Sequence, residues 1–203
     1  GTYRSHHYSP NTRGFAGGGQ TGYNWQLSRH WIVGLEVDLQ GSGAEGDASI
    51  TRTFSGSDLR LSAEQKVKWF GTARARMGYL FGPGTLVFGT AGLAYGKTEA
   101  NADFEVLSSI GIAVVGTTNL NACTMQVCMS GSKAGTSVGW TAGAGIERAL
   151  TDTVSFKAEY LHVDLGSETV RMVAQAPVTG SAFIDAKFKN AFDIVRVGLN
   201  VRF

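Results

Sequence analysis

The stretch VRVGLNVRF, from Val195 to Phe203, has an apolar residue at every second position, and the residues between are charged, amide or glycine. This period of two is the pattern of a β-strand with one apolar face and one polar face. Soluble domains often end in a polar tail, whereas this sequence ends on the aromatic residue of an alternating segment. The same two-faced pattern recurs along the chain, so we expect an all-β protein.

The composition favours a membrane protein that crosses with strands. Charged residues make up 17% of the chain and glycine is abundant at 28 residues, whereas soluble domains are roughly 25% charged. The most apolar run, Ile110–Val115, contains Gly111 and is far shorter than the roughly 20 residues of a membrane helix. A net charge of +2 without a Lys/Arg cluster argues against nucleic-acid binding. No signal peptide is visible, so we expect a mature product or a fragment.

Seven alternating segments predict seven strands. Tight turns join them at one end and long loops at the other, which is how an outer-membrane barrel places its turns in the periplasm and its loops outside. All three prolines lie outside these segments, as sheet hydrogen bonding requires. The predicted strands are Arg13–Leu27, His30–Gly41, Lys66–Phe81, Thr85–Ala100, Ser137–Leu150, Thr153–Gly166 and Lys187–Phe203, and the predicted long loops are Ser42–Gln65, Asn101–Thr136 and Ser167–Ala186.

An antiparallel barrel whose two ends both lie in the periplasm needs an even number of strands. We therefore expect one domain, an eight-stranded antiparallel transmembrane up-and-down β-barrel, whose first strand precedes Gly1. Residues 1–12 are polar and unpatterned and are expected to be the remnant of a loop; a short strand over Thr2–Tyr8 is the less favoured alternative. The last strand should close on the strand that precedes Gly1, and not on Arg13–Leu27.

Alternation places Val67 on the face of Trp69, and Lys68 on the face of Arg74, but it does not say which face points inward. Charges of both signs on the polar face favour a narrow lumen in which each buried charge finds a partner. The alternative is a soluble exterior with solvated charges. Glycines between the charges favour the lumen, and eight strands enclose room for side chains without a wide channel. The expected lumen ion pairs come from Glu36, Asp38, Arg74, Arg76, Glu147, Lys157, Glu159 and Arg196.

Aromatic residues gather toward the ends of the predicted strands and predict two girdles at the membrane–water boundaries. The first group lies near the tight turns and the second lies toward the long loops. The first comprises Trp25, Trp31, Tyr79, Phe81 and Phe203, and the second comprises Trp69, Tyr95, Trp140 and Tyr160.

Five stretches together resemble a known family: GFAGGGQTGYNWQLSRHWIVGLEVDLQGS (Gly14–Ser42), WFGTARARMGYLF (Trp69–Phe81), LVFGTAGLAYGK (Leu86–Lys97), GWTAGAGIERAL (Gly139–Leu150) and FKAEYLHVDLG (Phe156–Gly166). They are similar to the small porin-family outer membrane proteins of alphaproteobacteria, barrels related to opacity proteins and to the OmpA membrane domain. The resemblance implies an eight-stranded barrel and a final strand, ending in Phe203, that the barrel-assembly machinery reads. The loops do not carry the resemblance, so it implies nothing about surface recognition.

Cys123 and Cys128 lie in the longest predicted loop as CTMQVC. Two cysteines a few residues apart in an exported chain most often form a local disulfide, which we expect here. A metal site is the poorer alternative, because two thiols fall short of four ligands.

No pattern in the sequence indicates an enzyme, a metal site or a cofactor. His6, His7, His30 and His162 show no ligand spacing, and no Ser/His/Asp arrangement can be assembled from the strand ends. Carboxylates such as Glu36, Asp38 and Glu159 are expected to form ion pairs. The glycine-rich GFAGGGQTGYN is expected to be a closely packed strand, because no helix follows it as a phosphate loop requires.

Three hypotheses for function follow. The favoured one is a structural outer membrane barrel that supports the envelope and displays its loops, with little or no pore. The first alternative is a narrow channel for ions or very small solutes. The weaker alternative is an adhesin or receptor that uses an apolar hairpin within Ser108–Met129, although we favour these residues as extensions of the neighbouring strands. The expected partners are outer membrane lipid, lipopolysaccharide, the barrel-assembly machinery, and a second copy or another envelope protein.

Overall fold

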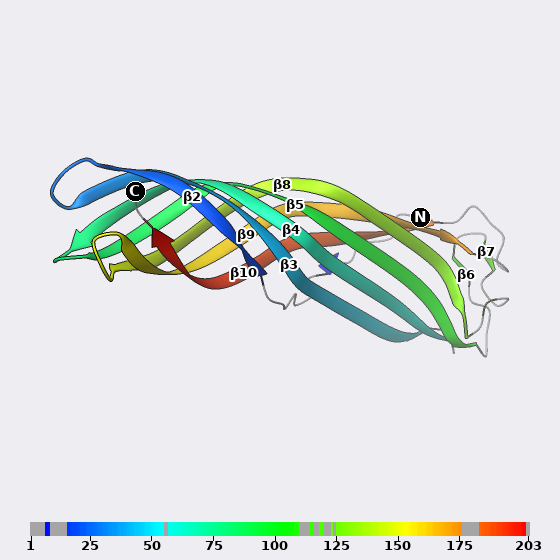
Figure 1. Cartoon of the computed structure of the whole chain (residues 1–203). Coiled ribbons are helices and arrows are strands. Elements are labelled where there is room, and N and C mark those ends of the chain that lie inside the picture. The colour runs from blue at the N-terminus through cyan, green and yellow to red at the C-terminus, as the bar shows by residue number, and fades with distance from the viewer. Residues whose placement is uncertain are drawn as a thin grey trace.

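The chain forms one curved sheet of long strands (Figure 1). This computed structural model describes residues 7–8, 16–54, 57–109, 114–115, 118–119, 123, 125–175 and 183–201. Within them, no helix is long and apolar enough to cross a membrane. The strands are β1 (His7–Tyr8), β2 (Ala16–Gln26), β3 (Trp31–Phe54), β4 (Ser57–Phe81), β5 (Thr85–Ser109), β6 (Val114–Val115), β7 (Thr118–Asn119), β8 (Val127–Ala149), β9 (Val154–Ala174) and β10 (Phe183–Val201).

Each long strand pairs antiparallel with its neighbour in the order β10-β9-β8-β5-β4-β3-β2, while β6 and β7 form a separate small hairpin. The seven long strands overlap the seven predicted segments, and the predicted tight turns join them. In the turn between β4 and β5, Gly82 and Gly84 have φ values of +60° and +85°, a conformation that favours glycine. Short turns and alternating faces therefore produce a meander in which sequence order and spatial order agree.

The strands run well beyond the limits that alternation predicts. β3, β4, β5, β8 and β9 pass through most of the residues expected to be long loops. His7–Tyr8, expected within the loop remnant, pairs in parallel with Lys187 and Phe188 of β10, so the short-strand alternative applies to those two residues. β5 extends to Ser109 and β8 begins at Val127, in line with strand extension, and β6 and β7 lie between them.

Polarity inverts along the strands at one level. On the outer face of β5, the residues from Val87 to Tyr95 are apolar or glycine, and those from Lys97 to Glu105 are charged or amide. On the inner face, the residues beyond Lys97 include the buried Ala100, Ala102 and Val106. An apolar outer face of nine residues spans about 26 Å along a strand. The half of the sheet next to the tight turns, which we call the lower half, thus has an apolar exterior. The other half, which we call the upper half, has an apolar interior.

Bulges mark the level at which polarity inverts. Register shifts interrupt the pairing of β3 with β4 between Gly41 and Ala44, and of β4 with β5 between Val67 and Trp69. An extra residue reverses which face the following side chains occupy. Val67 is therefore 2% exposed on the inner face and Lys68 points outward, so the alternation-based assignment of these two residues is wrong.

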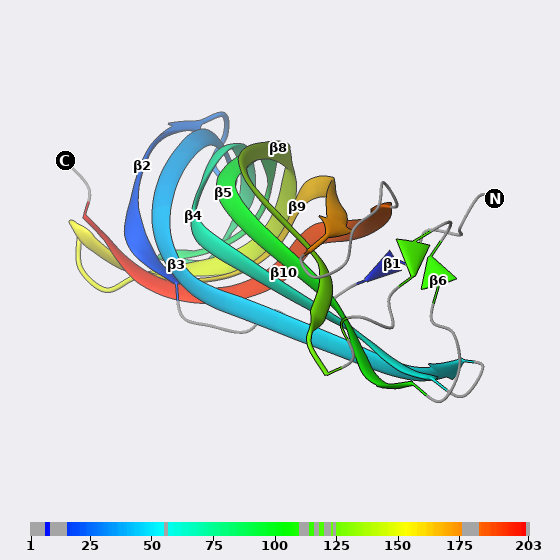
Figure 2. The ribbon, with the colours of Figure 1, turned by 90° about the vertical axis from the view of Figure 1, so that its right-hand side faces the viewer.

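The sheet curls so that β2 and β10 return toward one another (Figure 2). They are not paired through their backbones in the strand order, and all of β2 is exposed. The Gln20 amide on β2 donates a hydrogen bond of 2.6 Å to the Asn200 side chain on β10. The described sheet is thus an open barrel whose two long edges are linked by side chains.

Candidate functional site

The charged residues of the inner face form one buried cluster in the lower half of the sheet, which we call the ion-pair layer. Strand alternation points residues two apart to the same face, so Glu36 and Asp38 on β3 share the inner face with Arg74 and Arg76 on β4, and Glu36 lies directly opposite Arg74. The structure brings together all eight residues expected to form lumen ion pairs: Glu36, Asp38, Arg74, Arg76, Glu147, Lys157, Glu159 and Arg196.

Arg74 is the centre of the ion-pair layer, and its side chain is fully buried. Nη2 donates to Glu36 Oε2 at 3.0 Å and to Asp38 Oδ2 at 2.9 Å. Nη1 donates to Glu159 on β9 and to Thr90 on β5. The fixed fork of the guanidinium group thus joins three carboxylates from opposite sides of the interior.

Each of the other three cations contacts two carboxylates, and for each cation one of the two carboxylates lies on a strand that is not a neighbour of its own strand. The shortest N–O distances are Arg76 to Glu36 (2.8 Å) and Glu147 (2.6 Å), Lys157 to Glu36 (2.9 Å) and Glu159 (3.2 Å), and Arg196 to Asp38 (3.1 Å) and Glu159 (2.8 Å).

The ion-pair layer is electrically balanced and almost dry. Its four carboxylates match its four cations, and the most exposed side chain, Arg196, keeps 16% of its surface. Thr72 donates to Asp38, and the Phe88 ring lies 3.8 Å from the Arg76 guanidinium carbon. Buried charges are tolerated when they are paired and hydrogen-bonded, so this layer fills the interior with mutually neutralised groups.

Beyond the ion-pair layer, three further layers of side chains follow on the inner face, in the direction away from the tight turns. A lower apolar layer is succeeded by a polar layer and then by an outer apolar core. The lower apolar layer contains Phe70, Ala94, Leu161, Val163, Leu165 and Phe192, and the polar layer contains Gln65, Thr98, Ser137, Glu168 and Asn190.

A single strand shows the whole succession. Along β4 the inner face presents Arg74, then Phe70, then Gln65, then Ala63, and each of these side chains is buried. β9 and β10 pass through the same order of ionic, apolar, polar and apolar residues. Water and ions would have to cross a paired ionic layer and two apolar layers to traverse the interior.

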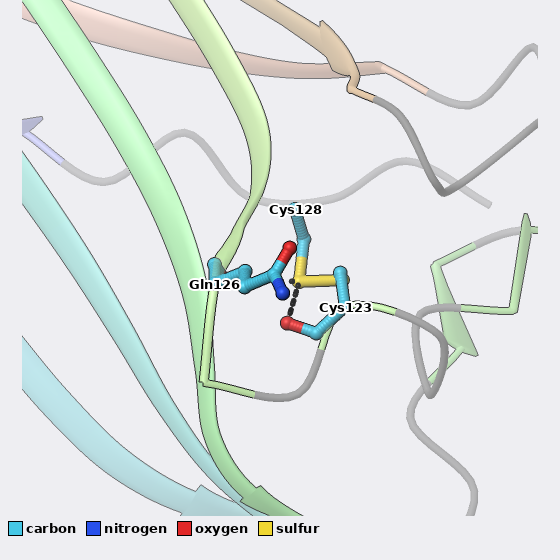
Figure 3. Close-up of a disulfide and its surroundings, with 3 residues drawn as sticks. All are labelled: Cys123, Gln126 and Cys128. Carbon is cyan, nitrogen blue, oxygen red and sulfur yellow. Dashed lines mark hydrogen bonds between the residues drawn. A yellow bond between two sulfur atoms is a disulfide. The ribbon is translucent and has the colours of Figure 1, made fainter.

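The outer apolar core contains a disulfide, which Figure 3 shows in close-up. Cys123 and Cys128 are joined, which confirms the predicted pairing, and both are fully buried. Cys128 Sγ lies 3.5 Å from the carbonyl oxygen of Cys123, a contact without a donated hydrogen because a disulfide sulfur carries no proton. Around the disulfide lie Ala63, Ala100, Ala102, Val106, Met129, Val170, Met172, Ala186 and Phe188. The disulfide therefore joins Cys123 to β8 inside the upper half.

One polar cluster on the outer face is not apparent from the sequence. The Tyr160 hydroxyl donates to Asp193 Oδ1 at 2.7 Å, and His162 Nδ1 lies 2.7 Å from the same oxygen. The Trp140 ring is 5.3 Å from the His162 ring. Asp193 and His162 are opposite each other in the register of β9 and β10, a relation that only the pairing reveals.

The remaining predicted residues have separate places. His30 stacks on Tyr79 with the ring centroids 5.4 Å apart. His6 and Phe203 lie outside the described residues. No group of three or more His, Cys, Asp and Glu side chains within the described part of the chain is placed to hold a metal ion.

A comparison with protein families decides what this arrangement is. A family model described as the outer membrane protein β-barrel domain matches residues 2–203. The chain belongs to the outer membrane protein β-barrel family. It is an outer membrane protein, and the family is non-enzymatic.

Alphaproteobacterial outer membrane proteins of this family are its relatives. The "31 kDa outer-membrane immunogenic protein" of Brucella melitensis is 38% identical over 190 residues, which cover 94% of this chain and 67% of the relative. The "22 kDa outer membrane protein" of Rhizobium leguminosarum bv. viciae is 29% identical over 171 residues, covering 83% of this chain and 62% of the relative. No solved structure gives a significant match.

Membership of the family gives the two halves of the sheet their places. An outer membrane β-barrel has an apolar outer band flanked by aromatic residues, about 25 Å tall. The outer-face residues from Val87 to Tyr95 fit that band, and Trp69 and Tyr95 lie at its upper limit with ring centroids 6.0 Å apart. The lower half therefore spans the membrane and the upper half projects from it.

Proposed function

We propose that this protein is a structural outer membrane barrel that is closed to solutes and carries an extended sheet on the outer side. The observation that carries this proposal is the ion-pair layer, in which no side chain is more than 16% exposed. An ion that entered the interior would find every charge of the ion-pair layer already paired. Beyond that layer it would meet the lower apolar layer. A narrow channel is the alternative outcome of the test below.

Display at the surface is the second part of the proposal. β4 and β5 each continue for more than ten residues beyond Trp69 and Tyr95 and pack around the outer apolar core. The Brucella melitensis relative is named as an immunogenic protein. An extended sheet with a charged outer face and a disulfide-anchored interior provides a stable surface of that kind.

We propose further that an eighth strand closes the barrel between β2 and β10. β2 and β10 both run from the outer end to the turn end, since an even number of antiparallel steps separates them. Direct closure would be a parallel pair, whereas one intervening strand restores antiparallel pairing on both edges. We place that strand before Gly1. The barrel-assembly machinery would read the last strand, ending in Phe203.

Conductance in planar lipid bilayers tests the closed state. Purified protein inserted at known density is expected to give flat current traces at 1 M KCl and 100 mV. The matched control is a variant with Phe70→Ala and the paired Arg76→Ala and Glu147→Ala changes, which keeps the ion-pair layer neutral while opening two layers; it should conduct. Regular single-channel steps from the unmodified protein would replace the structural function with the channel.

A further inference from the structure

The polar layer of the interior forms a ring that draws side chains from five strands. Ser137 Oγ on β8 donates to Glu168 Oε1 on β9 at 2.9 Å and lies 3.3 Å from the hydroxyl oxygen of Thr98 on β5. Across the interior, the Gln65 amide on β4 donates to Asn190 Oδ1 on β10. The register brings these two groups together, because Thr98 and Gln65 are diagonal neighbours on the inner face, as are Glu168 and Asn190. Five oxygen-bearing side chains therefore meet at one level of the interior.

Three atoms of this ring are buried without a hydrogen-bond partner in the described part of the chain: Gln65 Oε1, Asn190 Nδ2 and Glu168 Oε2. Gln65 is only 2% exposed and Asn190 only 1%, so bulk water does not reach these two amides. Turning both amides over exchanges the bonded atoms but still leaves one amide oxygen and one amide nitrogen unpaired. Buried polar groups are almost always paired in proteins, so three such atoms in one layer indicate a further partner.

The partner that Glu168 needs carries a positive charge. Glu168 is the one charged residue of the polar layer, and among the described residues no lysine, arginine or histidine forms an ion pair with it. Lys189, which is opposite the adjacent Ser167 in the β9–β10 register, contacts Asp164 instead at 3.6 Å. In the ion-pair layer, by contrast, every carboxylate meets a cation. A buried carboxylate between two apolar layers requires comparable compensation.

β8 and β9 part at the level of this ring. Their backbones are paired on either side of this level, but not over residues 131–139 of β8 and 165–172 of β9. Ser137 and Glu168 join the two strands here through their side chains. A Cβ placed on Gly135 would meet only Glu168 Oε1, at 3.6 Å. The two strands therefore leave a path by which a small ion can reach Glu168 without crossing either apolar layer.

The donor set decides which kind of cation fits. Carboxylate, amide and hydroxyl oxygens are the ligands of hard cations, and the ring contains no thiol or imidazole group for a transition metal. One carboxylate balances one positive charge. A divalent ion would leave a net positive charge buried between two apolar layers, which is costly. The charge and the ligands together select a monovalent alkali cation.

We propose that the polar layer binds one alkali cation such as Na⁺ through Glu168 Oε2, the Gln65 amide oxygen and the hydroxyl oxygens of Thr98 and Ser137. A water ligand of the ion accepts the hydrogen bond of the Asn190 amide and gives the remaining unpaired atom a partner. The ion neutralises Glu168 and joins β4, β5, β8 and β9 at one point. The site is independent of whether the interior conducts, which the bilayer measurement decides separately.

The test is urea unfolding of the protein in lipid vesicles, with Na⁺ exchanged for N-methylglucamine at constant ionic strength. A cation that binds only the folded state raises the folding equilibrium constant, by more than about tenfold for a hundredfold rise in Na⁺ above its dissociation constant. In E168Q and in Q65M the same rise should change the constant by less than about twofold. The control E99Q, at a carboxylate that pairs with Lys68 on the outer face, should respond as the wild type does.

The sign of the E168Q effect separates an ion site from a purely structural ring. In N-methylglucamine chloride E168Q should be more stable than the wild type, because glutamine needs no cation, and in NaCl the difference should shrink or reverse. Atomic emission after gel filtration should find one sodium per chain in the wild type and in E99Q, and none in E168Q. The proposal is overturned if stability follows ionic strength whatever the cation, which leaves water as the partner. It is equally overturned if Ca²⁺ stabilises the protein and Na⁺ does not, or if E168Q keeps the sodium response.

Discussion

Replacing Arg74 with glutamine removes the cation that joins three buried carboxylates. Arg74 is fully buried and contacts Glu36, Asp38 and Glu159, so its loss leaves four carboxylates against three cations in a nearly dry layer. Breaking a buried pair by removing one partner typically costs 3–5 kcal/mol, so we expect Arg74→Gln to lower the free energy of unfolding by about 3–5 kcal/mol. That is a large share of the roughly 5–15 kcal/mol by which most proteins are stable.

The double variant R74Q/E159Q supplies the decisive comparison, because it removes one charge of each sign and restores the balance. We expect it to be more stable than R74Q alone by at least about 1 kcal/mol. The measurement is reversible urea unfolding in lipid vesicles, followed by tryptophan fluorescence. Arg148→Gln, at an exposed arginine of β8, is the control and should change stability by less than about 0.5 kcal/mol. The ion-pair layer does not act as a coupled unit if R74Q costs under 1 kcal/mol. The same conclusion follows if the cost of R74Q/E159Q equals the sum of the costs of R74Q and E159Q measured separately.

Three further outcomes are expected. In Gly92→Ala, the new Cβ would lie 2.1 Å from the Ala73 carbonyl oxygen, whereas in Gly89→Ala it would lie 3.8 Å from its nearest neighbour, the Gly143 carbonyl oxygen. Unfolding in vesicles should show Gly92→Ala destabilised by about 1–3 kcal/mol and Gly89→Ala unchanged. Replacing both cysteines with alanine should cost about 2 kcal/mol, seen as faster hydrogen exchange in the upper half, with unchanged exchange there as the contrary result. Hydrogen bonds from Arg171 lower the pKa of Asp185. The stability that this ion pair contributes is present above the ordinary pKa of Asp185 and is lost as pH falls through the lower pKa of the folded state. In Arg171→Gln, the pKa of the Asp185 carboxyl group, followed by NMR, should return to about 3.8.

The lower half of the sheet was predictable from the sequence because one period governs it. From Val87 to Tyr95 and from Trp31 to Leu39, an apolar outer face alternates with an inner face that is polar or small apart from Phe88 and Ile32, so the strands and the charged residues of the interior follow directly. The disulfide was predictable for a different reason, since its two cysteines are only five residues apart.

The upper half was not predictable by the same reasoning. Its strands are rich in small and charged residues, and polarity is inverted with respect to the lower half, so the apolar inner face of Ala102 and Val106 looked like part of a loop. The bulge at Lys68 shifted the faces by one residue, which no periodic pattern signals. The contact of His162 with Asp193 required the register of β9 and β10.

Accessibility of the interior to water tests the central claim, a barrel sealed by its own side chains. Ala94 is fully buried in the lower apolar layer, and Lys97 is exposed on the outer face of the same strand. Because the native cysteines are joined, a cysteine introduced at either position is the reactive thiol. In reconstituted vesicles treated with a membrane-impermeant maleimide on both sides, Lys97→Cys should be labelled rapidly and Ala94→Cys should remain unlabelled. Labelling of Ala94→Cys at the rate of Lys97→Cys would show that water crosses the interior and would contradict the account.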